Sequence, residues 1–251
     1  IKQADIGIGM GNTGTEVTKD VADMILTDDN FATIVLAVEE GRRIFGNIQK
    51  TIQFLLSCNI AEVLSIFAIT LFFPKYTLFS AVQILFINLI TDTFPSIALG
   101  VNPAESDLMK EPPRNKNQYI IGGRVGVNIG YQGLTQALCV ILAFVIGIYV
   151  FSSPLVASTM AFITINLIQL FHMYNVKTNN SVFKTNPFKN KLVNYSFLLG
   201  VAILLFVALI PPIASVFGMT SLTINQWGVT IAISLLIIPV CEIAKAIQNK
   251  N

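Results

Sequence analysis

Long apolar segments and short polar segments alternate along most of this chain. Each apolar segment is long enough to cross the ~30 Å hydrocarbon layer of a membrane at a rise of ~1.5 Å per residue. The segments lie near residues 51–73, 78–101, 121–151, 155–176, 192–212 and 227–247. The pattern therefore predicts a membrane α-helical bundle of six transmembrane helices, occupying residues 48–251.

The first 47 residues follow a different pattern. ADIGIGMG alternates like a short buried strand that ends in a glycine turn, and TGTEVTKDVA is typical of a short helix. DMILTDD predicts a second strand, and the segment after it predicts a helix capped by Asn30. The order strand, helix, strand, helix favours the edge of an α/β domain with a parallel sheet, occupying residues 1–47.

Composition agrees with this division into a soluble and a membrane part. The chain is 53% hydrophobic and 12% charged, with eight of its 14 acidic residues in positions 1–45. A soluble domain carries about 25% charged residues. The chain starts at Ile1 inside an apparent strand, so we expect an N-terminal part to be missing.

The basic residues predict how the spans are oriented. Loops that hold several Lys and Arg alternate with loops that hold only Lys75. Because cytoplasmic loops are enriched in Lys and Arg, both ends of the chain are expected to be cytoplasmic. The chain is therefore expected to be a multi-pass integral protein of the plasma membrane.

The first two spans contain polar residues that could bind a cation. Asn59 and Glu62 are three residues apart on one predicted helix. Asn88, Thr91 and Asp92 share a face of the next helix. Their side chains offer only oxygen ligands, as hard cations such as Ca²⁺ prefer. A charged residue inside the membrane is usually functional, so these five residues form the candidate metal site, with a structural polar network as the alternative.

Pro95 follows this cluster by three residues. A proline removes one backbone donor and frees the carbonyl one turn earlier, near Thr91. Irregular backbone is tolerated at membrane depth where it lines a cavity or an ion site. We therefore expect locally unwound backbone beside Asp92.

Other polar or reactive residues favour structural roles. Glu242 and Lys245 are expected to form a surface or interfacial pair, and His172 to be packed or interfacial. Asn166 and Gln169 could face the bundle interior, which the sequence leaves open. The three cysteines lie in apolar runs and are interpreted as small buried hydrophobic residues. GIGMGNTG lacks the spacing of a dinucleotide motif, so a tight turn is expected.

Several motifs resemble one family. The run from ADIGIGMGNTG to FGNIQK resembles the end of the phosphorylation domain of P-type ATPases. CNIAE and NLITDTFPSIALGVNP resemble the fifth and sixth membrane helices of their calcium-transporting branch, and LMKEPPR and QLFHMYNVK are similar to bacterial members. The resemblance implies that residues 1–47 are the C-terminal part of a Rossmann-like, haloacid-dehalogenase-type phosphorylation domain and that residues 48–251 are family helices five to ten.

The resemblance also implies a mechanism. In the family, an aspartate in a DKTGT motif takes the γ-phosphate of ATP, and ion sites then alternate between the two sides of the membrane. DKTGT, TGES and GDGxND are absent from this chain, so Mg²⁺ and ATP are expected to bind outside it, and the chain alone should not hydrolyse ATP. Asn59, Glu62, Asn88, Thr91 and Asp92 match the family's ion ligands. We expect no catalytic or cofactor-binding residue within these 251 positions.

One departure concerns the eighth helix of the family, where pumps that carry two calcium ions have a further acidic ligand. Near that place this chain reads NVK, so Lys177 is expected to occupy or neighbour the site and to replace the charge of one ion. This predicts one Ca²⁺ per cycle.

The sequence is thus interpreted as the transport half of an ATP-driven pump that moves Ca²⁺ out of the cytoplasm. The helix from Asn30 to Lys50 and beyond, uninterrupted by a flexible linker, is the expected route of coupling. Expected partners are lipid, the transported cation and the missing N-terminal part of the same chain, but no nucleic acid. Alternatives are a secondary transporter or channel with a regulatory segment, a membrane-anchored dinucleotide-binding module, or a P-type pump for Mn²⁺, Na⁺ or H⁺.

Overall fold

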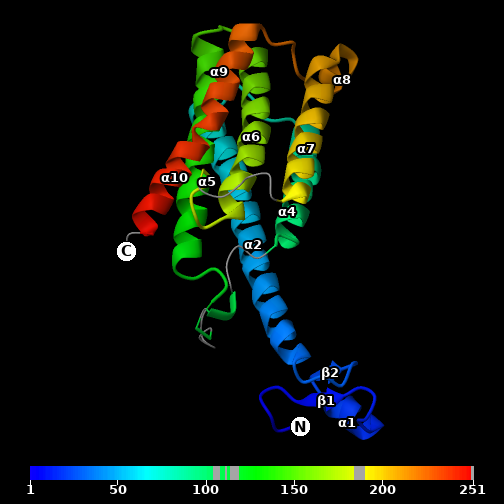
Figure 1. Ribbon diagram of the computed structural model, residues 1–251. Helices are drawn as coiled ribbons and strands as arrows, with labels where there is room; N and C mark the ends of the chain where they lie inside the picture. Colours follow the sequence, from blue (N-terminus) through cyan, green and yellow to red (C-terminus); the bar gives the residue numbers. More distant parts are fainter. Residues whose placement is uncertain (104–107, 111, 114–118, 184–189, 250–251) are drawn as a thin grey trace. The chain divides into compact units, whose positions relative to one another are not determined.

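The structure is a computed structural model that describes residues 1–103, 108–110, 112–113, 119–183 and 190–249. It divides into two compact units (Figure 1). One comprises residues 1–46 and 106–113, and the other comprises residues 47–105 and 114–251.

The first unit contains the short strands and helix that the sequence predicts. Strand β1 (Ile8–Met10) pairs in parallel with β2 (Met24–Leu26), and α1 (Glu16–Val21) connects them. The Thr15 side chain caps α1 by accepting a hydrogen bond from the Thr18 amide. A parallel pair requires such a crossover. The described part of this unit holds this strand–helix–strand element, the first turns of the helix that begins at Thr33 and a short 3₁₀ helix at Leu108–Lys110, and it does not show a Rossmann-like domain.

The glycine-rich run forms a turn, as expected. After β1 ends at Met10, the Gly11 amide donates to the Leu26 carbonyl at 2.8 Å. The Asp29 carboxylate then accepts from the Asn12 and Thr13 amides at 2.8 and 2.7 Å. These hydrogen bonds fix the turn.

Helix α2 (Thr33–Phe72) is continuous over 40 residues, as the sequence predicts for this segment. Asn30 precedes it, and its Oδ1 atom accepts from the Ala32 amide at 3.0 Å. The helix carries the first of six stretches that are long and apolar enough to cross a membrane.

The second unit is a bundle of helices that holds all six of these stretches, and the predicted six-span pattern is confirmed for the described residues. The second span is made of α3 (Ala81–Phe86), η1 (Ile87–Thr91) and α4 (Thr93–Gly100). The remaining helices are α5 (Arg124–Tyr149), α6 (Pro154–Lys177), α7 (Lys191–Leu209), α8 (Pro211–Val216), α9 (Ile224–Leu235) and α10 (Ile237–Gln248).

Prolines explain two of the helix breaks. Pro211 and Pro212 follow the end of α7 at Leu209 and occupy the first turn of α8, where a missing backbone donor costs little. Pro239 cannot donate to the residue 235 carbonyl, and the last span divides between α9 and α10 just before it.

Helix α6 is the centre of the bundle. It packs against α5, α7, α9 and α10, and Figure 1 shows it between α5 and α7. Most of its residues are buried, including large ones such as Phe162 and Ile163. Polar residues of α6 therefore face other helices rather than lipid.

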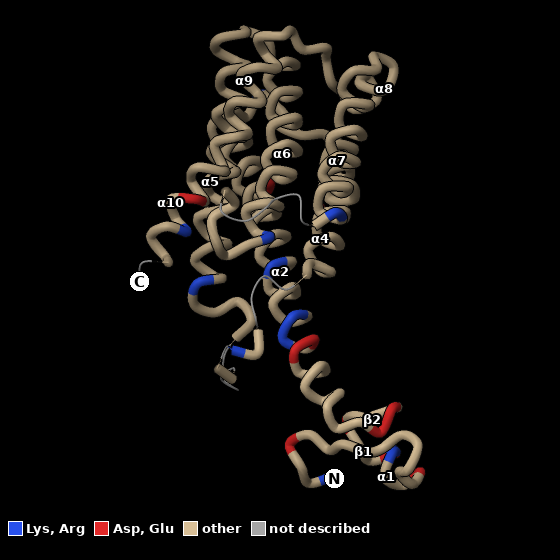
Figure 2. Tube along the Cα trace, in the orientation of Figure 1, with Lys and Arg blue, Asp and Glu red and all other residues tan. Residues whose placement is uncertain are grey.

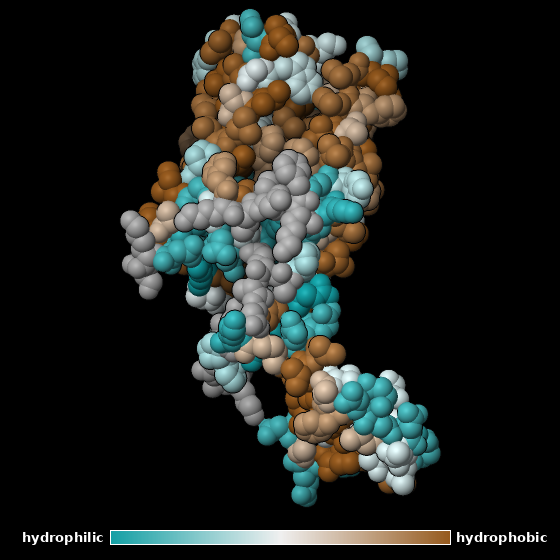
Figure 3. All heavy atoms as spheres, in the orientation of Figure 1, coloured by the Kyte–Doolittle hydropathy of each residue, from teal (hydrophilic) through white to brown (hydrophobic). Residues whose placement is uncertain are grey.

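The outer surface of the bundle is apolar. Figure 3 shows hydrophobic surface over α7 and α8, where Phe206, Leu209 and Val216 are all more than half exposed. In Figure 2, Lys and Arg residues of this unit lie where α5 and α7 begin and α10 ends. This distribution is typical of a bundle whose middle lies in lipid.

Candidate cation-binding site

The backbone is irregular where the second span carries its polar residues. η1 is a π-helix, and the Asp92 amide closes it by donating to the Ile87 carbonyl, five residues back, at 3.0 Å. Pro95 lies in the first turn of α4 and has no amide to donate to Thr91. The unwound backbone expected beside Asp92 thus takes the form of a π-turn, a feature that is frequent at functional sites.

Glu62 of α2 is buried among amide side chains. Its Oε2 atom accepts a hydrogen bond from Nδ2 of Asn88 at 3.2 Å. Its Oε1 atom accepts one from Nε2 of Gln169 on α6, also at 3.2 Å. The side chain is only 5% exposed, so these amides hold its orientation.

Thr91 links η1 to α6. Its hydroxyl donates a short hydrogen bond to Oδ1 of Asn166, and Nδ2 of Asn166 donates to the Phe162 carbonyl at 2.7 Å. Because the hydroxyl is the donor, the Thr91 oxygen keeps lone pairs that can contact a cation.

Asp92 is the least satisfied polar group of the cluster. It is 4% exposed, and neither carboxylate oxygen has a hydrogen-bond partner among the described residues. Buried polar atoms nearly always have partners, and an isolated buried carboxylate costs several kcal/mol. A bound cation would satisfy both oxygens, so the residues present fit a divalent ion as cargo.

The structure brings four of the five predicted residues together and leaves Asn59 apart. Asn59 is exposed, and its amide donates to the Leu55 carbonyl of its own helix at 2.8 Å. Residues three apart on a helix differ by about 60° in direction, so Asn59 lies at the edge of the face that buries Glu62. Asn88 is also exposed, although its amide reaches Glu62.

The expectation for Lys177 is wrong. Lys177 is the last residue of α6, eleven positions from Asn166, which is about 16 Å along a helix. Its carbonyl accepts from Nζ of Lys50 at 2.6 Å, far along the bundle from Glu62. The residues that α6 presents to the site are instead Asn166 and Gln169, whose direction the sequence left open. The sequence feature that could have indicated their role is a pair of amide side chains three residues apart in an otherwise apolar helix.

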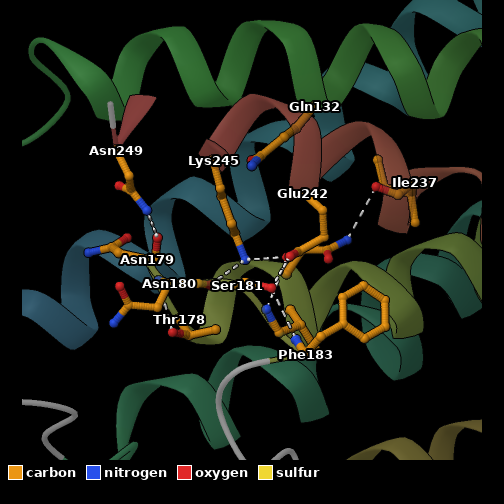
Figure 4. A network of polar contacts seen from close by, with 12 residues as sticks. Gln132, Thr178, Asn179, Asn180, Ser181, Phe183, Ile237, Glu242, Lys245 and Asn249 are labelled. Carbon is orange, nitrogen blue, oxygen red and sulfur yellow. Dashed lines mark hydrogen bonds and ion pairs between the residues drawn. The ribbon is translucent and has the colours of Figure 1, made fainter. Parts of the chain in front are cut away.

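Glu242 and Lys245 form the expected pair, but its position is largely buried rather than on the surface. Their side chains are 13% and 8% exposed. Glu242 accepts from the Ser181 hydroxyl and, at 3.0 Å, from the Val182 amide. Lys245 donates to the Asn180 carbonyl at 3.2 Å and to Glu242 at 3.4 Å. Figure 4 shows both side chains pointing at the segment after α6, so the pair fixes that segment to α10.

His172 is a packed residue, as expected. It is fully buried, its ring stacks on Phe54 with centroids 6.1 Å apart, and its Nε2 atom lies 3.1 Å from the Ser57 hydroxyl. The three cysteines are free and buried, which confirms their interpretation as small core residues. Among the described residues, no group of three or more His, Cys, Asp or Glu side chains could hold a metal. A cation would therefore depend on two carboxylates supplemented by amides and a hydroxyl.

Comparison with known families identifies the bundle. The model of the family described as "Cation transporting ATPase, C-terminus" matches residues 76–247. The chain belongs to this family of cation-transporting ATPases. The resemblance to P-type ATPases drawn from the sequence is confirmed.

The individual relatives are calcium-transporting ATPases by name. The chain is 39% identical to calcium-transporting ATPase 1 of Bacillus cereus over 100% of its own length and 30% of that protein. It is 38% identical to the calcium-transporting ATPase of Bacillus subtilis, over 94% of the chain and 26% of the relative. It is 37% identical to calcium-transporting ATPase lmo0841 of Listeria monocytogenes, over 100% of the chain and 28% of that relative. This cation-transporting ATPase chain thus spans less than a third of the length of these relatives.

Proposed function

We propose that the chain is the transport part of a P-type ATPase that moves Ca²⁺ out of the cytoplasm. Glu62, Asn88, Thr91 and Asp92 bind the ion, together with Asn166 and Gln169 of α6. The observation that carries the proposal is the buried Asp92 carboxylate, which has no hydrogen-bond partner among the described residues and lies on a π-turn between apolar helices. The names of the relatives support Ca²⁺ as the ion.

The ion count follows from the charges at the site. Among the described residues of the cluster, Glu62 and Asp92 are the carboxylates, and α6 contributes the neutral amides of Asn166 and Gln169. Two negative charges balance one divalent cation, so we expect one Ca²⁺ per cycle. This reason replaces the one based on Lys177.

Asn59 is a further ligand of the ion in this proposal, although its side chain is exposed in the described bundle. Asn59 and Asn88 both present amides at the surface of the described bundle, where they would be costly against lipid. Membrane helices from the remainder of the same protein would cover them. Residues 1–47 would belong to the phosphorylation domain, α2 would couple that domain to the site, and both ends of the chain would be cytoplasmic in the plasma membrane.

Energy would come from ATP bound outside these residues, with Mg²⁺. The chain by itself would not hydrolyse ATP. A secondary transporter or channel with the same cation site is the alternative from another class. It is distinguished by whether cation transport depends on ATP.

The test uses the full-length protein in membrane vesicles. Asp92→Asn removes one charge and is expected to abolish Ca²⁺-stimulated ATP hydrolysis and ATP-dependent Ca²⁺ uptake. Thr230→Val is the matched control, because Thr230 is a buried hydroxyl of α9 that bonds the Gln226 carbonyl of its own helix. Unaltered Ca²⁺ uptake in the Asp92→Asn variant would refute the site, and uptake without ATP would refute the pump. Measuring Mn²⁺, Na⁺ and H⁺ transport in the same vesicles tests the other ions.

A further inference from the structure

A pocket of about 360 Å³ lies at the end of the bundle where α2 ends and α6 begins. Its walls come from the turn after α2, the start of α3, the start of α6 and the segment after α8. Pockets that bind small molecules typically measure about 300–1,000 Å³. Glu62 and Asp92 do not line this pocket, so it is separate from the candidate cation site.

Lys75 brings to this pocket a positive charge that no nearby acidic residue in the sequence balances. Residues 74–80, 152–158 and 213–225, which form this end of the bundle, contain no Asp or Glu, and Lys75 is their only Lys or Arg. The Lys75 side chain is exposed, and it forms no ion pair within the described ranges of the chain. The charge of the pocket therefore favours an anion.

Gln83 adds a buried hydrogen-bond donor to the lining. Its side chain is only 1% exposed, and its Oε1 atom accepts from the Ser80 amide at 2.9 Å. The Ser80 hydroxyl accepts from the Gln83 amide at 3.3 Å, which completes a capping box at the start of α3. Because Oε1 is held in this way, Nε2 is held as well, and it donates to no other described residue. An acceptor inside the pocket would satisfy it.

Helix α6 adds the positive end of a long helix. Leu155 lines the pocket and follows Pro154, the first residue of this 24-residue helix. Backbone amides in the first turn have no partner within the helix, and the N-terminus carries a partial positive charge. Three independent features of the pocket thus favour a ligand with negatively charged acceptor atoms.

Contacts between the walls hold the pocket in shape. The Ser158 hydroxyl on α6 donates to the Leu78 carbonyl in the turn after α2, at 2.7 Å. Phe217, after α8, packs edge-on against Phe86 with ring centroids 5.5 Å apart. Phe217 and Leu155 give the pocket apolar surface beside its donors. A ligand with an anionic group and an apolar portion would match both kinds of surface.

We propose that this pocket binds a phosphate group through the Lys75 ammonium, Nε2 of Gln83 and the first turn of α6. A phosphate group has several acceptor oxygens and forms strong hydrogen bonds with charged donors and helix N-termini. The group belongs either to a phospholipid headgroup, since the pocket lies at the ends of apolar spans, or to inorganic phosphate. The inference does not depend on the cation site.

The test uses the full-length protein in detergent and two probes. Native mass spectrometry counts bound dioleoylphosphatidylglycerol, and dioleoylglycerol, which lacks the phosphate, is the reference lipid. Equilibrium dialysis against radiolabelled orthophosphate measures bound inorganic phosphate. Comparison of each variant with the parent protein removes the contribution of phosphate or lipid bound elsewhere.

The variants separate the charge of the pocket from its structure. Lys75→Gln removes the charge, and Lys75→Arg retains it. Gln83→Glu keeps an oxygen that can cap α3 but replaces the donor by a negative charge. Lys191→Gln is the matched control, because Lys191 is exposed at the start of α7, at the other end of the bundle.

We expect Lys75→Gln to weaken binding at this site about fivefold or more, as for loss of one lysine beside an anionic headgroup. Gln83→Glu should abolish binding there while the melting temperature without probe stays near that of the parent. Lys75→Arg and Lys191→Gln should bind like the parent. A loss seen only with phosphatidylglycerol assigns the site to a phospholipid, and a loss seen with orthophosphate assigns it to the free anion.

The proposal is overturned if Lys75→Gln binds both probes as the parent and Lys191→Gln do. It is also overturned if dioleoylglycerol binding depends on Lys75 to the same extent as phosphatidylglycerol binding, because the phosphate would then have no role. Should Gln83→Glu fail to fold, the comparison of Lys75→Gln with Lys75→Arg decides the question alone.

Discussion

Gln169 on α6 donates a hydrogen bond of 3.2 Å from Nε2 to Oε1 of Glu62 on α2, inside the helical bundle. The same carboxylate accepts from Asn88 of η1. Three segments that are far apart in the sequence thus meet at one buried charge. The position of Glu62 depends on α6, although α6 brings no charge of its own to this group.

Replacing Gln169 by leucine should therefore weaken cation binding without touching a carboxylate. Glu62 loses one donor, at a cost of about 1–3 kcal/mol, and is no longer held in place. We expect the Ca²⁺ concentration for half-maximal ATP hydrolysis to rise about tenfold in the full-length protein. Asn194→Ala is the control, because it removes a side-chain hydrogen bond to Tyr174 that lies outside the cluster. Equal Ca²⁺ dependence in Gln169→Leu and the parent would show that Gln169 does not position Glu62.

Pro95 should matter for affinity rather than for stability. In Pro95→Ala the new amide can donate to the Thr91 carbonyl, which favours regular α-helix over the π-turn at η1. Asp92 would then rotate relative to Glu62. We expect weaker Ca²⁺ activation with an unchanged or higher melting temperature. In Pro239→Ala, which relieves the comparable break in the last span, Ca²⁺ activation should be retained; if Pro95→Ala also retained it, the π-turn would have no role in binding.

The spans and the two carboxylates could be predicted from sequence for simple physical reasons. A membrane imposes a minimum length on apolar segments, so the six spans stand out from composition alone. Charged residues such as Glu62 and Asp92 are energetically costly in a membrane span, so their presence in the sequence already indicates a functional site. The position of Pro95 predicted irregular backbone. A missing backbone amide does not by itself determine that the irregularity is a π-turn.

Burial between helices could not be predicted in the same way. Lys177 and Glu242 lie near helix ends, where a charged side chain can face water or a neighbouring segment with equal local sequence. Which occurs depends on long-range packing, such as the contact of Glu242 with Ser181 sixty-one positions away. Asn59 lies outside the cluster because residues three apart on a helix differ by about 60° in direction. This angle is enough to place Glu62 on a buried face and Asn59 on an exposed one.

Gly147 should be essential for the α5–α6 contact. A Cβ atom built there would lie 2.3 Å from Cα of Ala157, which is backbone and cannot move aside cheaply. Gly147→Ala should lower the free energy of unfolding by at least about 1–3 kcal/mol through overpacking. Gly130→Ala on the same helix meets nothing within 4 Å and serves as control. Thermal unfolding in detergent measures both, and equal melting temperatures would contradict the close helix contact.

Glu242→Ala should destabilise the polar network between α10 and the segment after α6 that Figure 4 shows. It removes the acceptor of Ser181 and Val182 and leaves the buried Lys245 without its counter-charge. We expect a loss of about 1–3 kcal/mol or more. Glu16→Ala breaks another pair at the same spacing, with Lys19, but there the Glu16 side chain is 83% exposed, so its effect should be about 0–1 kcal/mol. An equal loss of stability in the two variants would show that Glu242 contributes no more than an exposed surface residue does.

The turn after β1 should depend on pH through Asp29. The Asn12 amide, followed by the Thr13 hydrogen bonds, holds the pKa of Asp29 below its ordinary value of 3.8. A lowered folded-state pKa means that the stabilising effect is complete above the ordinary value and is lost as the pH falls through the lowered one. In NMR spectra of the selectively labelled protein, the Asn12 and Thr13 amide resonances should shift only at a pH below 3.8. Asp29→Asn tolerates the positive φ of 50° at this position and should abolish the shift. A transition at the ordinary aspartate pKa would show that the carboxylate does not hold the turn.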